Sequence, residues 1–227
     1  MNALSHLIGM LRAPRQTLSE AIARPQPLRL AVLILSISAV CSVGFLMTRV
    51  GRLAGLDQQV RQLESMGTVV TDSLYAQLRA WQPYRPLLTA GAILLGWPIA
   101  WAAGAALILA VGRQADVTFA QVFSVLVHAS SVFALRAVVA APINYARESL
   151  GGATSLGVIV PGLGDATFAA RLFGSIDIFA LWWVALVAIG LGMLYRRRAA
   201  SIARWLLGAY ATGAAALALT QALRGGV

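Results

Sequence analysis

Three polar residues inside or beside long apolar runs are the first candidates for chemistry in this chain: His128, Arg136 and Asp177. If the runs are membrane helices, ionisable groups in them commonly mark proton or ion pathways. A lone histidine is more often held by a neighbouring hydroxyl. If the runs cross the membrane with the N-terminus inside, Arg136 and Asp177 lie at the same depth, near the outer membrane surface. There they either form an ion pair or act separately. In the second case Asp177 caps a helix start and Arg136 snorkels to the interface.

One short motif suggests proteolysis. Residues 162–165, Gly-Leu-Gly-Asp, match the GxGD signature of intramembrane aspartyl proteases, whose chemistry needs two carboxylates that share a proton. The second aspartate should lie in an earlier span, but Asp57, Asp72 and Asp116 fall outside the apolar runs. A protease is therefore kept only as a distant alternative.

Other residue types exclude several classes of chemistry. All 18 basic residues are arginine, which excludes lysine-dependent phosphate loops and Schiff bases. Cys41 is the single cysteine, so it forms no disulfide within the chain and no thiolate metal site. The only histidines, His6 and His128, are far apart in sequence and too few for a histidine metal centre. The sequence thus predicts no catalytic, cofactor-binding or metal-binding residues.

The apolar runs define the fold class. The 227 residues are 59% hydrophobic and 11% charged, with a mean hydropathy of +0.77, so polar surface is too scarce for a soluble globule. We predict an all-α, polytopic integral membrane protein with five transmembrane helices. The predicted spans are 29–49, 86–112, 117–140, 176–195 and 202–223.

Three further segments are predicted outside the spans. One precedes the five-helix domain, which comprises residues 29–227, and the other two lie within this domain. Residues 1–28 are expected to form two amphipathic helices on the cytoplasmic membrane surface. Residues 53–83 form an exterior amphipathic helical insertion with a break near Gly67, and residues 148–174 form an exterior glycine-rich loop. The apolar stripe of the insertion either packs on the bundle or docks another protein.

Arginine placement predicts the orientation. The net charge of +10 is assigned to the membrane surface and not to nucleic acid. Each side of the membrane receives nine of the 18 arginines, but one set lies close to span ends and includes the run 196–198. That set marks the cytoplasm. The N-terminus is then cytoplasmic and the C-terminus exterior, in the inner membrane.

Small residues at four-residue spacing are candidates for helix packing, because they let helix backbones approach closely in lipid. Self-association is the alternative use of such a stripe. Proline in the second span removes a backbone donor and predicts a kink. The candidates are Gly96, Ala100, Gly104, Pro98, Ala188, Gly192, Gly208 and Thr212.

Several segments carry a family resemblance. They are Pro14, Thr17, Leu18, Ile22 and Pro25 before the first span, residues 118–125 opening the third, and residues 175–182 with 189–191 in the fourth. In this order they resemble the Yip domain family of Ypt/Rab-interacting polytopic membrane proteins, especially its bacterial branch. The resemblance implies a five-helix membrane domain with a cytoplasmic N-terminus. Eukaryotic relatives are non-enzymatic factors in vesicle traffic, with a longer N-terminal region than this chain has, so that role is not carried over.

Two function hypotheses follow. The first is a non-enzymatic membrane accessory protein that docks to or regulates a membrane complex, with the bilayer, another membrane protein or a second copy as partner. The second is a small transporter or lipid-handling protein, with His128, Arg136 and Asp177 along a path. A polar cavity from His128 to Asp177 would favour transport, and a dry bundle would favour the accessory role.

The topology leads to a direct test. Reporter fusions after Gly112 and Arg198 should read cytoplasmic, and fusions near Gly67, Gly157 and Val227 should read exterior, because arginine-dense segments stay inside. A cytoplasmic C-terminus would mean that the glycine-rich loop also crosses the membrane.

Overall fold

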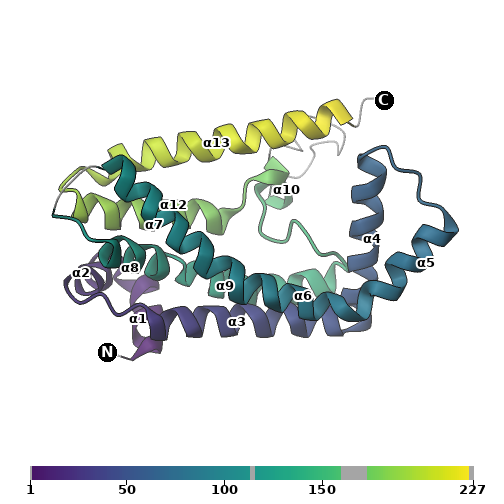
Figure 1. Ribbon diagram of the computed structural model, residues 1–227, viewed down its shortest axis with the longest axis horizontal. Helices are drawn as coiled ribbons and strands as arrows, with labels where there is room; N and C mark the ends of the chain where they lie inside the picture. The colour runs from purple at the N-terminus through teal and green to yellow at the C-terminus, as the bar shows by residue number, and fades with distance from the viewer. Residues whose placement is uncertain (1, 113–115, 160–172, 225–227) are drawn as a thin grey trace. The chain divides into compact units, whose positions relative to one another are not determined.

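The computed structural model describes residues 2–112, 116–159 and 173–224. Over these residues the chain is helical, and the one bridge between extended segments joins Ser155 to Asp177. This confirms the predicted all-α class for the described part of the chain. The elements (Figure 1) are α1 (Ala3–Arg12), α2 (Pro14–Ala23), α3 (Leu28–Met47), α4 (Arg49–Ser65), α5 (Asp72–Trp81), η1 (Gln82–Tyr84), α6 (Arg85–Gly91), η2 (Ala92–Gly96), α7 (Trp97–Gly112), α8 (Phe119–Ala129), α9 (Ser131–Ala146), α10 (Leu156–Ile159), α12 (Ile178–Leu194) and α13 (Ala199–Arg224).

Three helical segments among the described residues are long and apolar enough to cross a membrane: Leu28–Met47, Asp72–Gly112 and Phe119–Ala146. Helix α12 is apolar but shorter, at 17 residues. A span needs about 20 residues because the hydrocarbon core is about 30 Å thick. These helices mark a membrane protein. The count of five spans, the orientation and the choice of membrane stay predictions.

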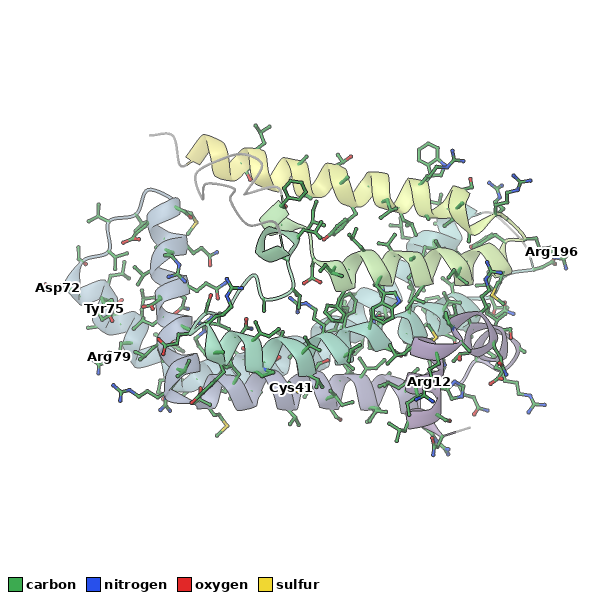
Figure 2. The ribbon with its side chains drawn as sticks, turned by 180° about the vertical axis from the view of Figure 1, so that it is seen from behind. Arg12, Cys41, Asp72, Tyr75, Arg79 and Arg196 are labelled. Atoms are coloured by element: carbon green, nitrogen blue, oxygen red, sulfur yellow. The ribbon has the colours of Figure 1, made fainter. Side chains whose placement is uncertain are left out.

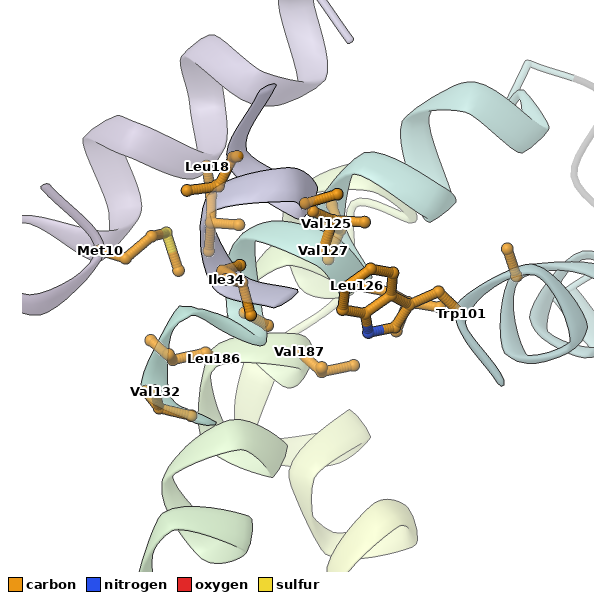
Figure 3. Packing of buried hydrophobic residues seen from close by; sticks show 14 of the residues in the cluster. Met10, Leu18, Ile34, Trp101, Val125, Leu126, Val127, Val132, Leu186 and Val187 are labelled. Carbon is orange, nitrogen blue, oxygen red and sulfur yellow. The ribbon is translucent and has the colours of Figure 1, made fainter. Parts of the chain in front are cut away.

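The chain divides into two compact units, which we describe separately. Unit 1 comprises Met1–Ser38, Gly91–Arg136 and Phe179–Ala209, and unit 2 comprises Ala39–Ala90, Ala137–Ile178 and Tyr210–Val227. The main apolar core belongs to unit 1 and draws side chains from α1, α2, α3, α7, α8, α9 and α12 (Figure 3).

The two predicted N-terminal helices are present, and part of their surface packs on the rest of unit 1. Asn2 caps α1 by accepting from the backbone N–H of Ser5, and Pro14 opens α2 at a position that needs no N–H donor. Met10 and Leu18 are fully buried in the core of unit 1, so these side chains pack on protein. The reason is α8, whose apolar side accepts α2. The membrane-surface location of residues 1–28 stays a prediction.

Unit 2 contains the predicted insertion as two helices, α4 and α5. Helix α4 ends at Ser65, and Gly67 adopts a φ of +78°, which glycine tolerates best. The break therefore falls where the sequence predicted it. A further link joins α4 to η1, the turn directly after α5: the Gln82 side-chain amide donates to Gln59 Oε1 of α4 at 2.8 Å.

The helix type changes next to Pro98 in the second apolar segment. Because proline has no backbone N–H, the carbonyl of Leu94 loses its usual α-helical donor. The preceding turn, Ala92–Gly96, is π-helical, and the α-helix resumes at Trp97. A π-helical turn is one known response to a broken hydrogen-bond ladder.

Helices α8 and α12 approach closely at a glycine. A Cβ atom placed on Gly190 of α12 would clash with the side chain of Val125 on α8. Both residues are buried. The contact therefore depends on the absence of a side chain at position 190.

Gly190→Ala should lower the free energy of unfolding in mild detergent by about 1–3 kcal/mol, because overpacking outweighs the helix preference of alanine. Adding Val125→Ala makes room and should recover part of the loss. Gly44→Ala is the control, since a Cβ on Gly44 meets no atom within 4 Å. Thermal melting of purified protein measures all three, and equal effects at positions 190 and 44 would contradict the close contact.

Candidate functional site

Ser130 joins three apolar helices through one hydroxyl. It lies between α8 and α9 and is fully buried. Its Oγ accepts from Trp101 Nε1 of α7 at 2.9 Å and from Trp183 Nε1 of α12 at 3.1 Å, and it donates to the Leu126 carbonyl at 2.8 Å. A hydroxyl has one donor and two acceptor sites, so Ser130 uses its full capacity.

His128 is buried two residues before Ser130, with 2% of its surface exposed. Its Nδ1 lies 2.8 Å from the Ser124 carbonyl oxygen. Since a carbonyl only accepts, Nδ1 carries the hydrogen, and this assignment rests on the geometry. Ser124 Oγ in turn donates to the Ala21 carbonyl of α2 at 3.2 Å. The histidine is therefore held by its own helix, and the serine ties that helix to α2.

The structure brings the two histidines together, although 122 positions separate them in sequence. The rings of His6 and His128 meet edge to face with centroids 5.2 Å apart. Their separation in sequence gave no sign of this contact. Helices α1 and α2 fold back onto α8, and this tertiary packing creates the contact.

A polar pocket of about 390 Å³ lies beside the two histidines, entirely within unit 1. We call it the N-terminal pocket. Its polar lining residues are His6, Glu20, Arg24, Gln26, Arg29 and His128. His6 Nδ1 is buried and has no hydrogen-bond partner among the described residues. The pocket therefore holds two guanidinium groups, one carboxylate and an unsatisfied ring nitrogen.

Metal binding is the first chemistry to consider where two histidines meet. Metal sites commonly use three or more His, Cys, Asp or Glu ligands. Within the described ranges no such group of three is close enough to hold an ion. The arginines that share the pocket favour an anion as the ligand.

Asp177 belongs to unit 2 and directly precedes helix α12. Its Oδ2 accepts from Thr154 Oγ1 at 2.6 Å, and its backbone N–H donates to the Tyr210 hydroxyl at 3.1 Å. Arg136 lies on α9 in unit 1. The proposed Arg136–Asp177 ion pair stays a prediction, and so does the helix-cap alternative.

The candidate packing residues occupy different environments. Ala188 and Gly192 of α12 are buried, and a Cβ on Gly104 of α7 would lie 3.3 Å from Leu126 Cδ1. Gly96 and Ala100 are exposed. Pro98 follows the π-helical turn, and Gly208 and Thr212 lie on α13.

The protease motif at 162–165 lies outside the described residues. Cys41 is a free, half-buried thiol on α3.

Sequence reasoning did not identify the tertiary contacts of two side chains, Ser130 and His6. Ser130 is one of the hydroxyl side chains near His128 in the sequence, and His6 is one of only two histidines. Trp101 and Trp183 reach the same serine because of how the helices pack, and not because of their spacing in the sequence. An N-terminal amphipathic segment that carries a histidine was the one signal for the pocket.

Comparison with known proteins finds no counterpart, since no family model, no curated protein and no solved structure matches the chain.

Ser130→Ala should lower the free energy of unfolding by about 1–2 kcal/mol, because two buried indole N–H groups lose their acceptor. Ser131→Ala is a matched control. The Ser131 hydroxyl is buried and has no partner in the described part of the chain, so its removal should be neutral or slightly stabilising. Thermal melting in detergent compares the two variants, and equal losses would contradict the role of Ser130 as a connector.

Proposed function

We propose that this protein is a non-enzymatic, Yip-like membrane accessory protein that docks to a membrane complex and organises or regulates it. The observation that carries the proposal is the use of buried polar groups in unit 1. Ser130, Ser124 and His128 all bond to neighbouring helices or to their own helix. These groups hold a bundle together and are not arranged as a reactive set.

The same arrangement weighs against the transport hypothesis. A transport path needs polar side chains that face water along a continuous route. Ser124, Ser130 and His128 are each at most 2% exposed. The aromatic side chains of Trp97, Trp101 and Phe133 pack on one another in the same bundle, which supports a dry interior.

Helix α5 in unit 2 is the proposed contact with the partner. It has no buried residue. Tyr75 is 41% exposed and Trp81 is 61% exposed, and Figure 2 shows Tyr75 and Arg79 on this helix. Aromatic and arginine side chains are enriched where protein interfaces concentrate their binding energy. A mixed aromatic and charged face fits a polar segment of another membrane protein better than it fits lipid chains.

A photo-crosslinking amino acid at Tyr75, introduced in the native host, should give one discrete protein adduct. The same amino acid at Val40 of α3, which is 71% exposed on an apolar helix, should give no discrete adduct. Recovery of that partner in mild detergent should fall at least tenfold in the Tyr75→Ala/Trp81→Ala variant, because interface aromatics contribute about 2 kcal/mol or more. Trp205→Ala removes an aromatic side chain outside α5 that is even more exposed, at 80%, and serves as control. Equal losses in both variants, or lipid adducts alone at position 75, would contradict the proposal.

A further inference from the structure

The N-terminal pocket has features of a ligand site that the accessory role does not use. It encloses about 390 Å³, within the usual size range for small-molecule sites of about 300–1,000 Å³. Its walls come from α1, α2, the α2–α3 connection, α3 and α8. Ser124 fixes part of this frame, because its hydroxyl donates to the Ala21 carbonyl and ties α8 to α2.

The buried polar groups of the pocket are incompletely satisfied. His6 Nδ1 is enclosed and without a partner among the described residues. His128 is 98% buried, and its Nδ1–H is already bonded to the Ser124 carbonyl. Its Nε2 is thus the ring nitrogen that remains for a ligand. Of the two, His6 Nδ1 is the buried nitrogen without a partner among the described residues. Such an unsatisfied buried atom costs free energy, and a ligand that bonds to it recovers part of that cost.

The charges in the pocket select an anion. Arg24 and Arg29 contribute two positive charges against one negative charge from Glu20. Guanidinium groups bind phosphate and carboxylate through paired, charge-assisted hydrogen bonds. Imidazole adds a group that accepts from a P–OH or, when protonated, donates to a phosphate oxygen. The combination of arginine, imidazole and the Gln26 amide suits a tetrahedral oxyanion with several acceptor oxygens.

The position of the pocket suggests where such an anion comes from. Arg29 lies in the first turn of α3, and α3 is one of the segments apolar enough to cross a membrane. The end of a span coincides with the headgroup layer of the bilayer, where phosphates are concentrated.

We propose that the N-terminal pocket binds a phosphate group, with Arg24 and Arg29 as the charged ligands and the rings of His6 and His128 as further parts of its lining. An anionic phospholipid headgroup and a free phosphate share this chemistry. Neither source depends on the accessory role or on α5, so the two proposals succeed or fail separately.

Calorimetric titration of the purified full-length protein in mild detergent tests the assignment. The probes are short-chain phosphatidylglycerol, short-chain phosphatidylcholine and inorganic phosphate. For each probe that binds the unmodified protein in the pocket, the Arg24→Gln/Arg29→Gln variant should bind at least tenfold more weakly, because two charge-assisted contacts are lost. Arg12→Gln/Arg15→Gln makes the same change in net charge on exposed arginines outside the pocket, and it should change affinity less than twofold. Glu20→Gln removes the opposing carboxylate and should tighten binding.

The probes distinguish the sources. Pocket-dependent binding of phosphatidylglycerol alone identifies a lipid headgroup, and pocket-dependent binding of inorganic phosphate identifies a soluble ligand. Both results support a phosphate site. Absence of binding by every probe overturns it, and so do equal losses in the two double-arginine variants. Because all four arginines are exposed, their substitution should leave the melting temperature unchanged, which the same samples verify.

Discussion

The packing of unit 1 depends on helix α8, which contacts other helices on several sides at once. Its residues 124–129 are all buried, and α2, α7 and α12 contact different faces of it. Such a helix tolerates few changes, because interior packing is as dense as in an organic crystal. Gly190 and Val125 meet at one of these faces, and Leu126 lies against Gly104 at another. The sequence of α8 is therefore constrained by neighbours on nearly every turn.

Serine hydroxyls act as connectors in this packed region. In lipid, helix association gains little from the hydrophobic effect, so small residues and short polar side chains decide which helices meet. Ser130 links α7 and α12 to the α8–α9 junction, and Ser124 links α2 to α8. A hydroxyl suits this task because it is small enough for close helix contact and still bonds in several directions. The polar groups of the bundle thus serve its architecture, which is why an accessory role is more consistent with them than a reaction.

The N-terminal helices connect this architecture to the proposed phosphate site. Burial of Met10 and Leu18 holds α1 and α2 against the bundle, and the same docking moves His6 next to His128. The pocket is therefore a consequence of packing. Of its two arginines, Arg24 directly follows α2 and Arg29 lies in the first turn of the apolar helix α3. Leu4 and Ile8 stay exposed on α1 and remain available to the membrane surface. One segment can in this way contact both the bilayer and the bundle.

The sequence by itself determined the helical class, the apolar segments and the local breaks. Hydropathy and helical spacing are properties of neighbouring residues, so Leu28–Met47 and the turn at Gly67 were predictable. The division of the N-terminal segment into two short helices followed from Pro14 and from the spacing of Leu18 and Ile22. Only the tertiary structure decided which polar groups meet. The contacts of Ser130 with Trp101 and Trp183, and of His6 with His128, join residues 29 to 122 positions apart. No local periodicity encodes such contacts, because they depend on how whole helices rotate and dock against one another.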